Sequence, residues 1–346
     1  MRDTRSCFSG GLAPSEPVGN TFQHRGHRLR LQLESAFSVC NRVHRARPPQ
    51  NRRRPPAPGR GYSPDANNAL KTCLLFFLLI CSARGETPAR VSFEPCLGMT
   101  RADLYHVKGV QNPWAVLVLC PGCNGNGEGL VSEPAWREFA REHNLGLVGL
   151  SFASEINDLR NGKGYYYAGR GSGKILLDGI NQLFKSDLPI LIYGFSGGAQ
   201  FASRFVEWKP KRVAAWCAYS AGWWDEPLPS NIMPPGIVAC GEDDGRLGAS
   251  LVYFKQGRAI GKPWLWIGIP NNGHSPDKRV ESFVRDYFAA IMKNNEISRA
   301  FHSGLWVDID LHVAVEAEMP DRHPSITGWL PDAGLFNTWQ SLNRGE

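Results

Sequence analysis

The sequence predicts an α/β protein in which a mostly parallel central sheet carries helices on both faces. From about residue 88, short apolar runs alternate with helix-like segments, and this alternation is typical of such a fold. The runs are continuously apolar, as strands buried on both faces of a sheet require. Several of them are bounded by glycine or proline, which commonly end a strand.

The expected elements follow one another at short intervals along the chain. Strands are predicted at 114–120, 145–152, 189–195, 212–220, 236–241 and 263–269. Helices are predicted at 133–143, 173–186, 198–208, 247–260 and 278–293. Together these elements form the domain that we expect over residues 86–296.

The pattern changes after about residue 297. Residues 304–320 alternate like an edge strand, and residues 325–339 predict a short helix anchored by Trp329 and Trp339. We therefore expect residues 297–346 to form an appendage packed on the main domain.

The positive charge of the chain belongs to its first part. Residues 1–68 contain twelve arginines, no lysine and four acidic residues, whereas the remainder has 27 basic and 28 acidic residues. The Pro/Arg-rich composition predicts a disordered basic leader over residues 1–69, and we expect the natural start of the protein near Leu70. An arginine-rich arm can contact nucleic-acid phosphates. We expect no such partner, because the next segment indicates export.

Residues 70–85 resemble a secretory signal peptide. Lys71 precedes an apolar stretch over 73–81, which is too short to span a bilayer, and small residues precede a possible cleavage site before Glu86. The alternatives are a buried helix or strand, and, with less support, a lipoprotein site. Export predicts a secreted or periplasmic protein without a stable membrane span. Cleavage would leave five cysteines, an odd number that leaves one thiol free or paired with another chain.

One serine stands where a predicted strand passes into a predicted helix. Gly194-Phe195-Ser196-Gly197-Gly198 has the pattern and the position of a nucleophile elbow. Such a turn is strained, and its glycines let neighbouring backbone approach closely. The turn predicts that Ser196 is a nucleophile at the carboxyl edge of the sheet.

A nucleophilic serine requires a base and an acid that orients the base. His274 follows the last predicted strand, at the same edge of the sheet as Ser196, and is the best-placed histidine. Glu242, Asp243 and Asp244 follow the preceding strand, and the chain order Ser, Asp, His is that of elbow-type hydrolases. We expect Asp244 to orient the imidazole, with Asp243 second and Glu242 third.

The loop at 120–129 is rich in glycine, and we expect it to complete an oxyanion hole. One N–H donor would come from Gly197 and the other from the backbone of Cys123. Cys120 and Cys123 also form a C-x-x-C motif, which is typical of thiol redox sites, but the following residues are a poor helix start. Residues 168–175 depart from the phosphate-binding loop pattern, and we expect them to cap the next helix.

Together these residues resemble the α/β-hydrolase superfamily, nearest to secreted esterases of the polyhydroxybutyrate-depolymerase and feruloyl-esterase kind. The motifs that carry the resemblance are Pro121-Gly122-Cys123, Gly194 to Gly198, Asp244 and His274. The resemblance implies a serine hydrolase that cleaves carboxylic esters through an acyl-enzyme, with no cofactor and no metal. Many relatives have His-Gly where this chain has Pro121-Gly122, which leaves the subfamily open.

Aromatic residues near the predicted site suggest how a substrate binds. Trp223, Trp224 and Tyr166 can stack on sugar rings or aromatic acyl groups, although they can equally serve to pack the domain. The segment 221–235 is too short for a large cap domain, so we expect an open cleft that admits bulky or polymeric esters. A serine peptidase, a non-catalytic carbohydrate-binding protein and a thiol redox protein remain as alternatives.

Overall fold

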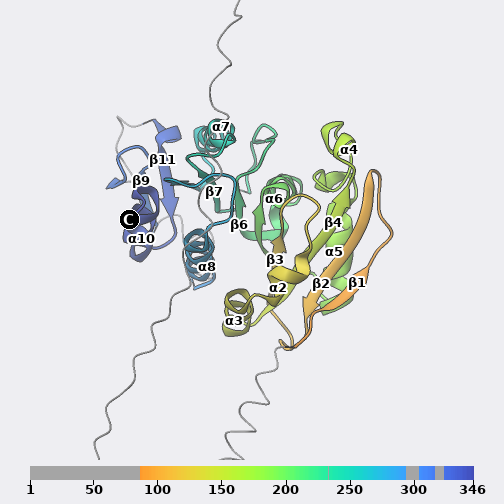
Figure 1. Ribbon diagram of the computed structural model, residues 1–346. Coiled ribbons are helices and arrows are strands. Elements are labelled where there is room, and N and C mark those ends of the chain that lie inside the picture. The colour runs from red at the N-terminus through yellow and green to blue at the C-terminus, as the bar shows by residue number, and fades with distance from the viewer. Residues whose placement is uncertain (1–85, 233, 294–303, 316–322) are drawn as a thin grey trace, which may run out of the picture. The chain divides into compact units, whose positions relative to one another are not determined.

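The computed structural model describes residues 86–232, 234–293, 304–315 and 323–346 (Figure 1). The predicted leader and signal peptide lie outside the described residues. The centre of the fold is an eight-stranded sheet with the order β1-β2-β4-β3-β5-β6-β7-β8. Its strands are β1 (Ala89–Ser92), β2 (Met99–Val107), β3 (Ala115–Cys120), β4 (Leu145–Ser154), β5 (Ile190–Phe195), β6 (Val213–Tyr219), β7 (Gly236–Gly241) and β8 (Trp264–Ile269).

The six predicted strands are the parallel strands of this sheet. Every residue of β3, β4, β7 and β8 is buried, which explains why these strands are continuously apolar in sequence. Strand crossovers put helices on both faces, so the fold class is the predicted α/β class. A parallel sheet brings the carboxyl ends of β5, β7 and β8 to one edge.

Strands β1 and β2 were not predicted from the sequence. They pair antiparallel with each other, and β2 pairs antiparallel with β4. Both lie at one side of the sheet. No residue of β1 is fully buried and β2 mixes buried with exposed positions, so they lack the continuous apolar run of the inner strands. His106 lies within β2.

Helices cover both faces of the sheet (Figure 1). Trp136 of α3 packs against Tyr193 of β5, and Arg285 of α8 lies over the Trp136 ring, so α3 and α8 share a face. On the opposite face, Trp208 of α6 contacts α5, and Glu207 of α6 pairs with Lys262 after α7. These helices are α3 (Pro134–Glu142), α5 (Ser172–Phe184), α6 (Gly197–Trp208), α7 (Leu247–Ala259) and α8 (Lys278–Lys293).

Two short helices, α2 (Gly127–Ser132) and α4 (Ile156–Arg160), were also not predicted. The glycine-rich residues before α2 were expected to be a poor helix start, yet Asn126 caps it by accepting from Glu128 N at 2.9 Å. Residues 168–175 were predicted to cap α5. In the structure, Ser172 is instead the first residue of this helix, and its hydroxyl donates to the Tyr165 carbonyl. No helix among the described residues is both long and apolar enough to cross a membrane.

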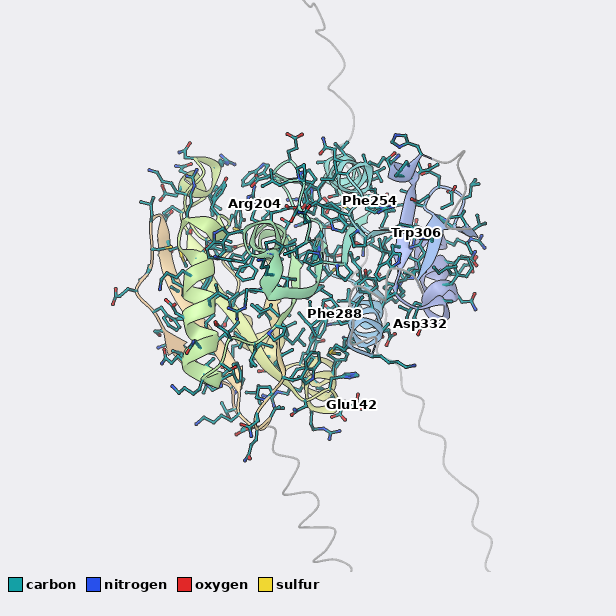
Figure 2. All side chains as sticks on the ribbon, turned by 180° about the vertical axis from the view of Figure 1, so that it is seen from behind. Glu142, Arg204, Phe254, Phe288, Trp306 and Asp332 are labelled. Carbon is teal, nitrogen blue, oxygen red and sulfur yellow. The ribbon has the colours of Figure 1, made fainter. Side chains whose placement is uncertain are left out.

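The described part of the C-terminal segment forms a second, three-stranded sheet and a helix. The strands are β9 (Leu305–Asp308), β10 (Val313–Val315) and β11 (Thr327–Leu330), in the order β10-β9-β11, followed by α10 (Phe336–Arg344). Trp329 and Trp339 are both fully buried, but Trp329 lies on β11 and not on the predicted helix. Trp339 Nε1 donates to the Trp266 carbonyl of β8 at 2.8 Å, and Arg258 of α7 lies 4.6 Å from the Trp306 ring (labelled in Figure 2). These contacts join the appendage to the main sheet.

Candidate active site

Ser196 occupies a strained turn between β5 and α6. Its φ of +52° and ψ of −113° lie in a region that a residue with a side chain rarely adopts. The turn is held on the sheet side by a hydrogen bond from Ser196 N to the Tyr219 carbonyl at 2.8 Å. Since α6 begins at Gly197, the serine lies at the positive end of the helix dipole.

The flanking glycines are required by close backbone contacts. A Cβ added at Gly194 would lie 2.3 Å from the Gly198 oxygen, and one added at Gly198 would lie 2.1 Å from the Cys120 oxygen. Atoms cannot approach so closely, so only glycine allows α6 to start directly against β3 and β5. The tight packing of these three elements therefore fixes the conformation of the turn.

Ser196, His274 and Asp244 form one chain of hydrogen bonds. His274 Nε2 lies 2.9 Å from Ser196 Oγ, and His274 Nδ1 lies 2.7 Å from Asp244 Oδ2. With Nδ1–H donating to the carboxylate, Nε2 is the acceptor for the serine proton. The imidazole also stacks on the Phe195 ring at 5.1 Å, which limits its rotation.

Asp244 is the member of the acidic triplet that faces His274. It is buried, whereas Glu242 and Asp243 are exposed. Its Oδ1 accepts from the backbone N and the Nη1 of Arg246, at 3.1 and 3.0 Å. Burial by itself would raise the pKa of Asp244, but hydrogen bonds from His274, Arg246 and Ser220 outweigh it and place that pKa below its ordinary value. The carboxylate is thus ionised throughout the neutral pH range.

Gly197 and Cys123 lie beside each other next to Ser196. A Cβ on Gly197 would come within 2.7 Å of Cys123 Cα and 2.8 Å of the hydroxyls of Tyr165 and Tyr166. As the first residue of α6, Gly197 has an amide without an intrahelical acceptor. In the described ranges the Cys123 amide also has no hydrogen-bond acceptor. These two N–H groups are available to an oxygen bound at the serine.

Arg101 holds the Cys123 loop in place, a role that no pattern in the sequence indicates. From strand β2, its Nη2 donates to the carbonyls of Asn124 and Gly125, at 2.8 Å each. The same loop is tied to β4 through Asn124 Nδ2 and the Ser154 carbonyl, at 3.0 Å. No local motif marks Arg101, because its partners lie more than twenty residues away in the chain and β2 itself was not predicted.

The three aromatic residues predicted to bind substrate have different environments. Trp223 is 45% exposed, and its ring lies 6.1 Å from that of Tyr166. Tyr166 is buried, with its hydroxyl against Gly197. Trp224 is half-buried, stacks on Tyr253 at 4.2 Å and donates to Ser250 Oγ at 3.2 Å. Of the three, Trp223 is the ring with an open face, whereas Trp224 packs against α7.

The cysteine pair does not have the features of a redox site. Cys120 is buried in β3, where desolvation raises the pKa of its thiol well above the ordinary value, and Cys123 is exposed. Both are free thiols in the structure, as are the other three described cysteines. A thiol that is kept protonated is a poor nucleophile for disulfide exchange.

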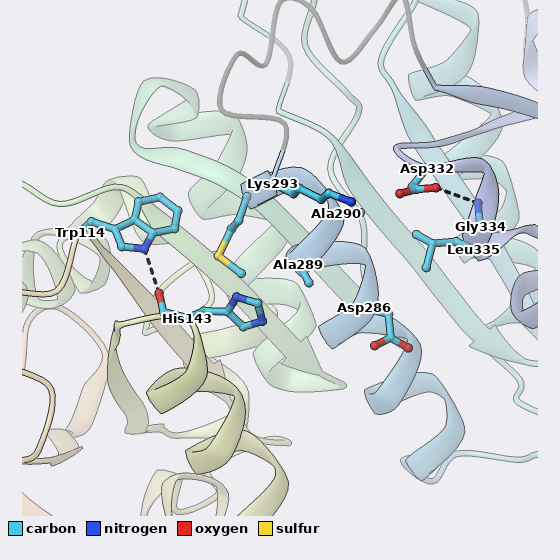
Figure 3. Close-up of a pocket in the computed structure, with 10 residues that line it drawn as sticks. Trp114, His143, Asp286, Ala289, Ala290, Lys293, Asp332, Gly334 and Leu335 are labelled. Carbon is cyan, nitrogen blue, oxygen red and sulfur yellow. Dashed lines mark hydrogen bonds between the residues drawn. The ribbon is translucent and has the colours of Figure 1, made fainter.

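One hollow of the structure lies away from this site (Figure 3). It has a volume of about 750 Å³, and it lies between α3, α8 and the start of α10. Of its lining residues, Trp114 directly precedes β3 and His143 lies just before β4. The hollow is therefore at the opposite edge of the sheet from Ser196. Over the described ranges, no group of three or more His, Cys, Asp and Glu side chains forms a metal site.

The strand order, the antiparallel second strand and the strained serine after β5 together define one fold. The chain has the α/β-hydrolase fold. No family model and no curated protein matches its sequence.

Several solved structures with this fold resemble the chain at low sequence identity. The poly(3-hydroxybutyrate) depolymerase LpqC from Bordetella parapertussis is 17% identical, with 61% of this chain and 91% of that one covered and a TM-score of 0.43. A hyperthermophilic esterase from the archaeon Pyrobaculum calidifontis is 12% identical, with 66% and 92% covered and a TM-score of 0.45. Poly(aspartic acid) hydrolase-1 from Sphingomonas sp. KT-1 is 18% identical, with 55% and 94% covered and a TM-score of 0.42. Of these, LpqC carries the name of a group that the sequence motifs resemble.

Proposed function

We propose that this chain is a serine hydrolase that cleaves carboxylic esters. The observation that carries the proposal is the hydrogen-bond chain from Ser196 through His274 to Asp244, which begins at a strained strand-to-helix turn. Such a chain has a clear chemical use, because it removes the serine proton as the oxygen attacks.

In the first half of the reaction, Ser196 Oγ attacks the ester carbonyl carbon while His274 Nε2 accepts the hydroxyl proton. The carbonyl oxygen becomes an oxyanion that accepts hydrogen bonds from the amides of Gly197 and Cys123. The intermediate then collapses, the C–O bond to the alcohol breaks, and the imidazolium returns its proton to the departing alcohol. An acyl-enzyme on Ser196 remains.

In the second half, water attacks the acyl-enzyme while His274 again accepts a proton. A second oxyanion forms at the same two amides, and its collapse releases the carboxylic acid and returns the proton to Ser196. Asp244 stays ionised throughout and stabilises the imidazolium at each step.

Two further features of the proposal concern the substrate and its location. The exposed Trp223 ring would form one wall of the cleft and stack on a ring of the substrate, with Tyr166 behind it. Residues 70–85 would direct the chain out of the cytoplasm, so that the ester is met outside it.

The experiment is a comparison of full-length wild type with Ser196→Ala on phenyl acetate and on the matched amide, acetanilide. We expect wild type to hydrolyse the ester, the amide to react at least about a hundredfold more slowly, and the variant to lose about 10⁴-fold or more in kcat. Faster cleavage of the anilide would favour a peptidase. Ester cleavage that is unchanged in Ser196→Ala would contradict the proposal.

A further inference from the structure

Two tyrosine hydroxyls lie against the first residue of α6. Because Gly197 has no side chain, the hydroxyls of Tyr165 and Tyr166 come within 2.8 Å of the position that its Cβ would occupy. Both tyrosines belong to the segment that follows α4, and both are buried. A side chain at position 197 would collide with both hydroxyls. The glycine therefore admits two polar groups beside Ser196.

The place that these hydroxyls occupy is next to the point where an oxyanion would bind. In a helix the Cα–Cβ bonds tilt toward the N-terminus, and the free N–H groups of the first turn point to the same end. An oxygen that accepts from the Gly197 amide is therefore a neighbour of the Gly197 Cβ position. Cys123 approaches from the same side, since its Cα lies 2.7 Å from that position. The two hydroxyls and the two amides thus lie around one small region.

The two hydroxyls have different partners. Tyr165 Oη accepts from the backbone N of Asn124 at 3.2 Å, so it supports the loop that contains Cys123. The Tyr166 hydroxyl faces the Cys123 thiol and the Tyr165 hydroxyl. Because sulfur is a weak acceptor, the Tyr166 proton can turn to a stronger one. Of the two hydroxyls, Tyr166 is the one available to a substrate.

The electrostatic environment of Tyr166 keeps its hydroxyl a donor. Burial raises the pKa of Tyr166 above its ordinary value, and the Cys123 side chain raises it further, whereas the contact with Tyr165 lowers it. A hydrogen bond that lowers the pKa of a phenol is one that the phenol oxygen accepts, so Tyr165 donates to Tyr166. The phenol therefore stays protonated at neutral pH, with its own proton directed away from Tyr165.

We propose that the Tyr166 hydroxyl donates a third hydrogen bond to the oxyanion, beside the amides of Gly197 and Cys123. The inference rests on the proposed function, because it adds a catalytic residue to that site. The phenol keeps its proton throughout, and no bond to Tyr166 forms or breaks. As negative charge develops on the substrate oxygen, the hydroxyl turns to it from the thiol. A charge-assisted hydrogen bond is the stronger kind, so the hydroxyl stabilises the transition state more than the bound ester.

The first test is Tyr166→Phe, which removes only the hydroxyl. We expect kcat for phenyl acetate to fall by about 10- to 100-fold while KM stays within about twofold, because the interaction is made in the transition state. The matched control is Tyr167→Phe, which removes a neighbouring hydroxyl that donates to the Leu159 carbonyl at 3.0 Å. It should keep kcat within about twofold. An unchanged kcat in Tyr166→Phe would overturn the proposal.

A change of substrate separates oxyanion binding from general damage to the fold. The thionoester O-phenyl ethanethioate carries sulfur where phenyl acetate carries the carbonyl oxygen, and sulfur is the weaker acceptor. The ester-to-thionoester ratio of kcat/KM should therefore fall at least about fivefold in Tyr166→Phe and stay within about twofold of wild type in Tyr167→Phe. Asp244→Asn should slow both substrates by similar factors. A slower Tyr166→Phe with the wild-type ratio would mean a structural role only, and would overturn the proposal.

Labelling of Ser196 by a fluorophosphonate keeps the test independent of ester hydrolysis. The phosphoryl oxygen of the probe gains negative charge during attack, so it uses the same donors. Labelling that is at least about fivefold slower in Tyr166→Phe, but not in Tyr167→Phe, would support the donor even if no ester were cleaved. Hydrolysis and labelling that Tyr166→Phe leaves unchanged would overturn the donor and leave the proposed function intact. Absence of both reactions in wild type would overturn both proposals.

Discussion

The turn at Gly194 to Gly198 and the segment that follows β6 both lie at the carboxyl edge of the sheet, but they are built in opposite ways. The turn is strained, packed against backbone on both sides and unable to accept a single extra methyl group. The segment after β6 presents an exposed tryptophan and is held by side chains from α6 and α7. The comparison indicates that the proposed nucleophile is held by backbone packing, whereas the proposed substrate-facing surface is held by side chains.

The largest effect should come from the acid that orients His274. Asp244→Asn should lower kcat by about 10³- to 10⁴-fold, because the amide no longer stabilises the imidazolium and favours the wrong tautomer. Its exposed neighbour offers a matched control, and Asp243→Asn should change kcat by less than about twofold. Steady-state kinetics on phenyl acetate measures both variants. Equal losses in the two would show that Asp244 has no special role.

The strain in the turn can be tested through stability. Gly198→Ala should lower the free energy of unfolding by about 3 kcal/mol or more, since its Cβ would lie 2.1 Å from the Cys120 oxygen. Gly248→Ala is the control and should be neutral or stabilising by up to about 1 kcal/mol, because it replaces glycine inside a helix. Urea denaturation gives both values. A neutral Gly198→Ala would mean that the turn is less tightly packed than described.

The segment after β6 contains two adjacent tryptophans, which should contribute differently to stability. Trp224→Ala should lower the free energy of unfolding by about 2 kcal/mol or more, through loss of its stacking on Tyr253 and of its hydrogen bond. Trp223→Ala should change it by less than about 0.5 kcal/mol, yet lower kcat/KM for ring-bearing esters by about five- to tenfold. Similar stability losses in both variants would remove the distinction between an anchoring and an exposed ring.

A smaller effect is expected in the pH dependence of stability. The pKa of Asp244 is lower in the folded protein than its ordinary value of about 3.9, so the folded state binds this proton more weakly than the unfolded state. Its contribution to stability is present above about pH 4 and is lost as the pH falls through the folded pKa. The difference in unfolding free energy between wild type and Asp244→Asn should therefore shrink on acidification below pH 4. A difference that stays constant would contradict this assignment.

The sequence predicted the inner sheet well because burial on both faces leaves a strong local pattern. Strand β4, for example, has every residue buried and reads as an uninterrupted apolar run. Strands β1 and β2 lie at one side of the sheet, where many of their residues are not buried. They therefore leave no continuous apolar run, and the sequence did not predict them. Trp329 was assigned to a helix because four strand residues bounded by loops leave too short a pattern to distinguish.

The juxtaposition of side chains at the site was predictable where chain order and strand ends determined it. Ser196, Asp244 and His274 each follow a parallel strand, so topology alone brings them to one edge. The groups that support them depend on tertiary contacts: Arg246 faces back onto Asp244, Phe195 stacks on His274, and Arg101 reaches the Cys123 loop from an unpredicted strand. No spacing rule in the sequence identifies such contacts.

The most direct test of the central claim is covalent labelling of the full-length protein with a fluorophosphonate, followed by peptide mass mapping. The probe reports activation of a serine without requiring the natural ester. We predict a single adduct on Ser196 in wild type and an at least hundredfold slower reaction in His274→Ala. An adduct on another serine, or none on Ser196 in folded protein, would contradict the account of Ser196 as a nucleophile activated by His274.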